Sequence, residues 1–114
     1  MLILIMHWTI TFYNERVKLA LAKWPCTLKA KLTRILELMK EEGGDIGLPI
    51  TRAMGEGLFE IRVKAQEGIG RVFFAYIHHK EMMILHGFIK KTQETPAKEL
   101  QIARQRLKEV KAHE

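Results

Sequence analysis

The stretch LFEIRVKAQEGIGRVFFAYIHHKEMMILHGFIKK, residues 58–91, decides the fold of this chain. Apolar and polar side chains alternate along much of it, and turn residues interrupt it near Gly68 and again at residues 78–81. Alternation with a period of two is typical of strands whose two faces meet different surroundings. The pattern predicts three strands, and the short turns between them predict an antiparallel meander over residues 58–64, 71–77 and 82–91.

The residues before this meander carry one strand signal and two helix signals. Residues 3–13 are rich in β-formers and predict a further strand. Two helices follow, one at residues 15–23 with Asn14 as its N-cap and one at residues 27–42, where apolar side chains recur at helical spacing. Residues 45–57 contain Gly and Pro without a clear period, and they predict a loop.

A last helix and the chain length complete the expected architecture. Pro96 begins a helical pattern that continues to residue 111, and Pro in the first turn of a helix costs no hydrogen bond. The predicted element order is therefore β-α-α-β-β-β-α. With 114 residues, this order predicts a single domain over residues 1–114. Its class is α+β, with a mainly antiparallel sheet and the helices on one sheet face.

The charge balance favours an acidic partner. Lys and Arg total 19 against 13 Asp and Glu, which gives a formal net charge of +6 and a sequence pI near 9.6. A small domain this basic suits RNA, DNA or an acidic protein. The alternative is that the excess charge serves solubility alone.

Several classes of site are excluded by residue types and their spacing. Cys26 is the single cysteine, which excludes an internal disulfide and a multi-cysteine zinc site. His78 and His79 are adjacent in a predicted turn and point apart, so we expect no metal there. The apolar residues 1–6 lack a basic flank and are too short to span a bilayer. We therefore expect a cytoplasmic protein with no membrane partner.

The two faces of the meander can be assigned because side chains alternate across a sheet. The face that the helices cover is predicted to take the apolar residues Phe59, Ile61, Val63, Val72, Phe74, Tyr76, Met83, Leu85 and Ile89. The open face is predicted to gather charged and aromatic residues, with some aliphatic ones: Glu60, Arg62, Lys64, Arg71, Phe73, Ala75, Ile84, His86, Phe88 and Lys90. One β-bulge would exchange residues between these faces.

This open face suits the handling of a phosphodiester. Arg and Lys side chains can hold a phosphate and offset the negative charge of a pentacoordinate transition state. Phe73 and Phe88 can stack on nucleobases. Glu60 or His86 can accept a proton from a ribose hydroxyl. The alternative interpretation is a solvated face with ordinary cross-strand charge pairs, such as Glu60 with Arg71.

A set of motifs carries a family resemblance. The run LHGFIKKTQETP at residues 85–96 follows GRVFF at 70–74 and LFEIR at 58–62. Together with WTITFYN at residues 8–14, these motifs resemble the RelE/HigB superfamily of bacterial toxins, and within it the phage-derived HigB-like branch. The resemblance extends from about residue 6 to residue 110.

The resemblance implies a compact RelE-like domain that is the toxin of a type II toxin–antitoxin pair. Such toxins are ribosome-dependent mRNA endoribonucleases, also called mRNA interferases. They enter the ribosomal A site and cleave the bound codon through attack by the ribose 2′-hydroxyl, a hydrolase-type activity that uses no metal or other cofactor. The implied partners are the ribosome, mRNA and a cognate antitoxin, expected to be a helix-turn-helix protein.

The resemblance also assigns residues. Arg62 matches the family's basic residue on the second strand, Arg71 matches the arginine that opens the third, and Lys90 and Lys91 match the basic pair that closes the last. Residues 92–95 offer no Tyr, His or Asp for proton transfer. Glu60 is therefore our candidate proton acceptor, with His86 and ribosomal RNA as alternatives. The catalytic candidates are Arg62, Arg71, Lys90 and Glu60, and the RNA-binding candidates are Lys91, Lys64, Phe73, Phe88 and His86.

Two other functions stay open at this point. A ParE-like inhibitor of DNA gyrase would use the same fold to bind a protein without cleaving anything. A degenerate prophage remnant would bind only an antitoxin or nucleic acid. Fold alone does not separate these functions, because function resides in the site.

Overall fold

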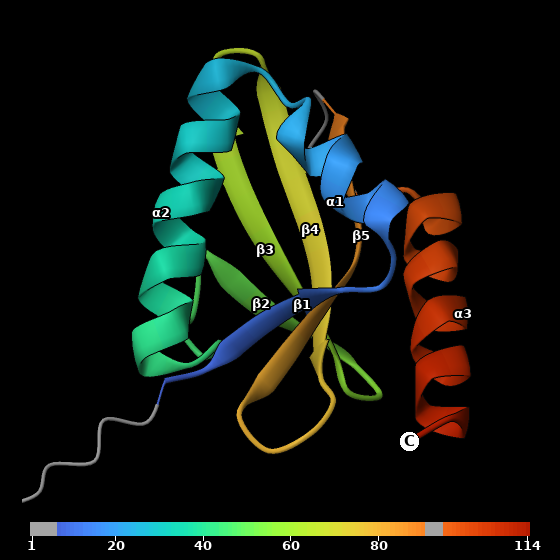
Figure 1. The fold of residues 1–114 in the computed structure, drawn as a ribbon. Coiled ribbons are helices and arrows are strands. Elements are labelled where there is room, and N and C mark those ends of the chain that lie inside the picture. Colours follow the sequence, from blue (N-terminus) through green and yellow to red (C-terminus); the bar gives the residue numbers. More distant parts are fainter. Residues whose placement is uncertain (1–6, 91–94) are drawn as a thin grey trace, which may run out of the picture.

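The structure, a computed structural model, describes residues 7–90 and 95–114. Its elements in chain order are β1 (Thr9–Phe12), α1 (Glu15–Ala22), α2 (Cys26–Glu42), β2 (Thr51–Gly55), β3 (Leu58–Ala65), β4 (Gly68–Tyr76), β5 (Glu81–Lys90) and α3 (Ala97–Ala112) (Figure 1). The strands form one sheet in the order β1-β5-β4-β3-β2. Only the β1–β5 pair among these neighbours is parallel. The predicted α+β class with a mainly antiparallel sheet is confirmed.

One strand lies within the residues predicted to be a loop. β2 pairs antiparallel with β3, with Thr51 opposite Ile61, so the loop prediction for residues 45–57 is wrong over this strand. Its sequence TRAMG shows no regular apolar–polar alternation, and in the structure a register shift after Ala53 interrupts its pairing with β3. The turn into β3 has positive φ at Gly55, Glu56 and Gly57, which Gly adopts without strain.

The predicted first strand is shorter in the structure than in the sequence pattern. Of residues 3–13, the described part forms β1 only over Thr9–Phe12, and residues 1–6 lie outside the described residues. β1 lies beside β5, with Thr9 opposite Glu81 and Phe12 opposite Ile84. The N-terminal strand therefore closes one side of the meander.

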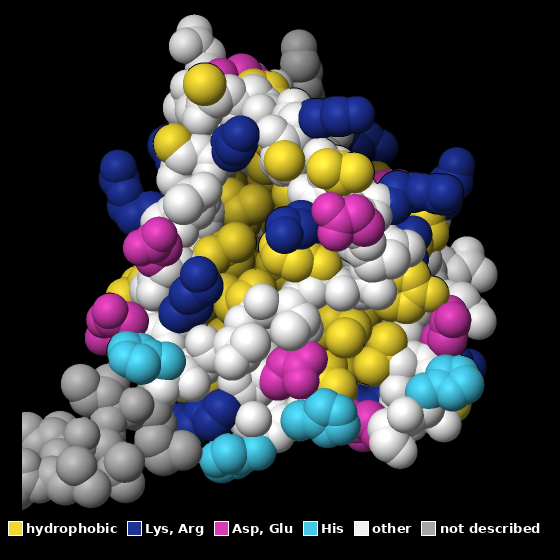
Figure 2. Space-filling model, viewed as in Figure 1, with side chains coloured by type: hydrophobic (Ala, Val, Ile, Leu, Met, Phe, Trp, Pro, Cys, Tyr) yellow, Lys and Arg dark blue, Asp and Glu magenta, His cyan; other side chains and the backbone are white. Residues whose placement is uncertain are grey.

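The sheet has a helix layer on each face, so the prediction that all helices cover one face is wrong. On one face α1 and α2 pack over a core that contains Val17, Leu21, Trp24, Leu28, Leu32 and Met39 with Ile61, Val63, Val72, Phe74, Met82 and Ile84. On the other, α3 covers a smaller core of Leu58, Phe73, Ala75, Ile77, Leu85, Ala103 and Leu107. The apolar stripe of α3 needs an apolar partner, and one end of the second face supplies it. Hydrophobic side chains are visible between α1 and α2 in Figure 2.

A bulge in β5 accounts for the residues whose predicted face was wrong. Phe73 pairs with His86, whereas the next residue, Phe74, pairs with Ile84, so Leu85 is an extra residue on β5. Ile84, predicted on the open face, belongs to the core under α1 and α2. Leu85 and Met83, predicted on the covered face, pack in the core under α3 instead. Beyond the bulge the predicted alternation holds, with Ile89 in the first core and Phe88 beside the second.

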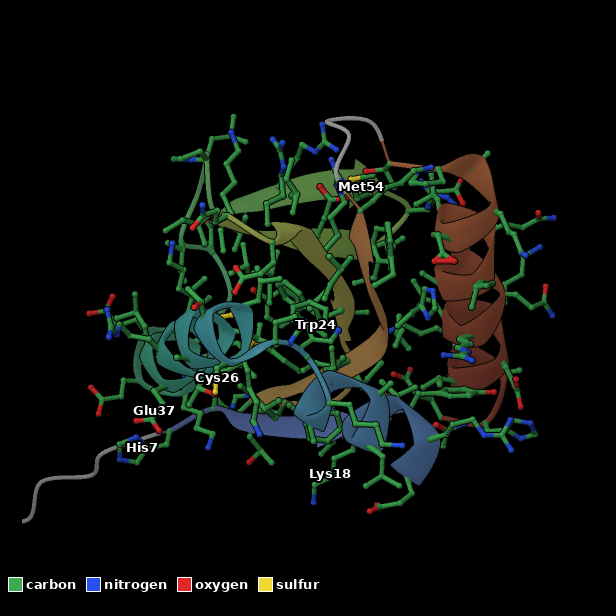
Figure 3. All side chains as sticks on the ribbon, turned by 90° about the horizontal axis from the view of Figure 1, so that it is seen from above. His7, Lys18, Trp24, Cys26, Glu37 and Met54 are labelled. Atoms are coloured by element: carbon green, nitrogen blue, oxygen red, sulfur yellow. The ribbon has the colours of Figure 1, made fainter. Side chains whose placement is uncertain are left out.

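Trp24 packs closely on the backbone of β4. The residue follows α1 and its ring points into the space between the helices and the sheet (Figure 3). A methyl group added at Gly70 would lie 2.6 Å from Cζ3 of this ring. A glycine is therefore required at position 70, because any side chain there would collide with the Trp24 indole, which lies close to the β4 backbone.

We expect Gly70→Ala to lower the free energy of unfolding by about 1–3 kcal/mol, the usual cost of overpacking a core. Urea denaturation followed by circular dichroism measures this loss. Trp24→Phe removes the ring atoms that collide, so the double variant should lose less than the sum of the two single variants. Strictly additive losses would contradict the proposed contact.

Candidate functional site

Charged residues from β2, β3, β4 and β5 lie in rows on the sheet face that α3 partly covers. In one row Arg52, Glu60, Phe73 and His86 are successive cross-strand partners. The next row contains Arg62, Arg71 and Phe88, and the one after it contains Lys64, Ile69 and Lys90. The register therefore brings the predicted cations of three neighbouring strands to one end of one face. Lys91 lies outside the described residues.

Some residues of these cross-strand rows lie at the surface and others are buried. Lys64 and Lys90 are exposed, and Arg62 is half-buried. Glu60, Arg71 and Phe73 have 0% exposed area, so the prediction that they lie open to solvent is wrong. Phe73 is buried because α3 packs over it with Ala103 and Leu107.

Glu60 is the centre of a buried polar network. One carboxylate oxygen, Oε1, accepts a hydrogen bond from Arg52 Nη2 at 3.1 Å. The other, Oε2, accepts one from Thr95 Oγ1 at 2.8 Å and lies 3.7 Å from Arg71 Nε. Both oxygens are therefore engaged, and the carboxylate ties β2 and β4 to the chain that enters α3.

Arg71 carries its charge inside this network. Burial lowers the pKa of the Arg71 guanidinium, the Glu60 carboxylate opposes that shift, and nearby Arg62 and Arg52 add to it. Two guanidinium groups thus lie beside one carboxylate, and a third, that of Arg62, is close enough to act on Arg71. Their excess positive charge makes this end of the face attractive to an anion.

Three rings form an array beside the network. The Phe73 and His86 rings are nearly parallel with centroids 6.5 Å apart, and Phe88 lies 6.0 Å from each of them. His86 Nε2 is 3.1 Å from Glu99 Oε2 on α3. Because Phe73 is buried, only His86 and Phe88 of this array present partly exposed surface to a nucleobase.

Two members of the network were missed at the sequence level. Arg52 lies in the segment predicted as a loop, so its position opposite Glu60 followed only from the observed β2 pairing. Thr95 directly precedes the helix predicted to begin at Pro96, and that position does not predict a hydrogen bond to Glu60. The available signal for Thr95 was that a polar side chain stands immediately before Pro96.

Two features are absent from the described residues, 7–90 and 95–114. Among these, no three His, Cys, Asp or Glu side chains lie together as a metal site would require. In the same part of the chain, every helix is too short or too polar to cross a membrane.

Comparison with known proteins supplies the family. The model of the family described as Phage derived protein Gp49-like (DUF891) matches residues 20–108. This chain belongs to the Gp49-like family. That family is toxin-like and part of the RelE superfamily. A search of curated proteins found no match. The Gp49-like match spans the cationic end of the sheet, all of α2, the last three residues of α1 and α3 as far as residue 108.

We expect Glu60→Gln to destabilise the Gp49-like domain by about 3–5 kcal/mol, because it removes the carboxylate charge that lies 3.7 Å from the buried Arg71 guanidinium. Gln keeps the size of the side chain, so the loss reports charge rather than packing. Chemical denaturation measures it, with the exposed turn variant Glu67→Gln as the matched control. Equal stabilities of the two variants would disprove the role assigned to the buried pair.

Proposed function

We propose that this chain is the toxin of a type II toxin–antitoxin pair and acts in the cytoplasm as a ribosome-dependent mRNA endoribonuclease of the HigB-like branch. Membership of the Gp49-like family supports the toxin role. The observation that carries the nuclease activity is the cationic end of the sheet, where Arg62, Lys64 and Lys90 lie around the buried Arg71. Cations from three strands in one place suit an RNA backbone.

The proposed reaction is attack of a ribose 2′-hydroxyl on the adjacent phosphorus. The bond from phosphorus to the 5′-oxygen of the next nucleotide breaks, and the 5′-oxygen takes up a proton from water, so that a cyclic phosphate and a free 5′-hydroxyl result. Arg62 and Lys90 hold the phosphate and offset the charge that develops on its oxygens. Lys64 and Lys91 contact neighbouring phosphates, and Phe88 stacks on a base.

Burial changes the roles proposed for Glu60 and Arg71. A general base must reach the proton that it accepts, and the Glu60 carboxylate is buried with both oxygens engaged. Glu60 is therefore a positioning residue that holds Arg71, and Arg71 acts through its charge from below the surface. His86 or a group of the ribosome accepts the 2′-proton, since His86 is partly exposed on the same face.

Inhibition of DNA gyrase is the second candidate function. The burial of Glu60, Arg71 and Phe73 favours it, because a toxin that only binds a protein needs no accessible catalytic group. The two functions differ in target, so assays on purified gyrase and on translating ribosomes separate them.

We expect Arg62→Ala to lower the rate of mRNA cleavage by about 10²–10³-fold, the usual effect of losing one contact to transition-state charge. Cleavage is measured in a purified translation system by mapping new 5′ ends of the message. Arg62→Lys should retain more activity than Arg62→Ala because it keeps the charge. Lys108→Ala, which removes an exposed cation from α3, is the matched control and should cleave as the parent chain does.

The circular dichroism spectrum of each variant checks that the fold is intact. Intact message in the presence of the folded chain and translating ribosomes would reject the nuclease activity. If the chain then blocks supercoiling by purified gyrase, the second candidate replaces the first. Full cleavage by Arg62→Ala would leave the nuclease in place and reject only the site.

A further inference from the structure

A groove of about 420 Å³ lies between α2 and the edge of the sheet. Its lining is half cationic and half aliphatic: Lys31, Arg34 and Ile35 from α2, Pro49 and Ile50 before β2, and Arg62, Val63 and Lys64 from β3. The cations stand on both walls, since two come from the helix and two from the strand. The groove therefore offers positive charge around an apolar floor.

The strand wall of this groove is an edge of the sheet. β2 is paired with β3 only as far as Ile61, and the Ile50 carbonyl then accepts the Arg62 N–H at 2.8 Å. Beyond this point β3 continues to Ala65 at the edge of the sheet. Lys31 Nζ donates a hydrogen bond to the Lys64 carbonyl at 2.8 Å, which fixes α2 against this edge. A strand edge is a surface on which an extended segment of another chain can lie.

We propose that this groove binds an extended acidic segment of the neutralising partner protein, in which carboxylates alternate with aliphatic side chains. Four cations would pair with the carboxylates, and the floor formed by Ile35, Pro49, Ile50 and Val63 would take the aliphatic side chains. Single-stranded RNA fits this lining less well. Grooves that bind it combine cations with aromatic platforms, and the residues that line this groove include no aromatic ring.

The position of the groove couples partner binding to activity, and this step rests on the proposed function. Arg62 and Lys64 belong both to the groove and to the cationic end of the sheet. A carboxylate and an RNA phosphate would compete for the same two side chains. The bound segment would therefore neutralise the toxin by occupying its phosphate-binding cations.

Fluorescence anisotropy with synthetic probes tests the groove on the full chain. The first probe is a short labelled peptide in which Glu alternates with Val, the second has Gln for Glu, and the third has Ser for Val. We expect the Glu–Val peptide to bind and both altered peptides to bind at least tenfold more weakly. Arg34→Ala should weaken binding of the first peptide about tenfold, since one charge-assisted contact is lost.

Lys29→Ala is the matched control, because it removes an exposed cation from the same helix outside the groove. Equal affinity of the Glu and Gln peptides, or equal effects of Arg34→Ala and Lys29→Ala, would overturn the proposal. A labelled single-stranded RNA that depends on Arg34 while the peptide does not bind would assign the groove to RNA instead. These assays contain no ribosome. Peptide binding that depends on Arg34 in a chain that fails to cleave mRNA would therefore retain the groove and reject only the nuclease.

Discussion

The buried pair of Glu60 and Arg71 is the constraint on which the rest of the structure depends. A buried ion costs several kcal/mol unless a partner and further hydrogen bonds compensate it. Here the carboxylate of a central strand compensates the guanidinium of the next, and Arg52 and Thr95 occupy its remaining acceptor positions. The pair therefore fixes the position of an edge strand and of the chain that enters α3. The cationic end of the sheet surrounds this pair, on the face that α3 partly covers.

This arrangement separates two uses of charge on one sheet face. Arg71 and Glu60 are buried and hold the elements together, whereas Lys64 and Lys90 are exposed and Arg62 is half-buried. A phosphate that reaches this end of the face would meet surface cations with a further guanidinium beneath them. Two of these cations, Arg62 and Lys64, also line the groove beside α2. In the two proposals above, substrate binding and neutralisation would therefore share one physical basis, which is competition between anions for Arg62 and Lys64.

The face of each residue in β3 and β4 could be predicted from the sequence because alternation is a local property. That is why Arg62, Lys64 and Arg71 were placed together correctly. Alternation assigns a residue to a face of the sheet but does not say where along that face it lies. The face that α3 partly covers has an apolar end and a cationic end. α3 covers the apolar end, so the exposure predicted for Phe73 was wrong. The bulge at Leu85 and the strand at Thr51–Gly55 were not predicted for a related reason, since each depends on its register with another strand. The groove was not predicted because its walls are about thirty residues apart in the sequence and meet only through tertiary packing.

The parallel pairing of β1 with β5 has a consequence for synthesis of the chain. Thr9 leaves the ribosome early, but its partner Glu81 is made more than half a chain later, and Thr95 later still. Contacts this distant in sequence cannot form while the C-terminal part is untranslated. In a nascent copy, therefore, β1 cannot pair with β5 and α3 cannot pack on the sheet until translation is nearly finished. The hydrogen bond from Thr95 to Glu60, the partner of the buried Arg71, is missing until the same stage. For the ribosome-dependent toxin proposed above, this delay would protect the ribosome that is synthesising the chain.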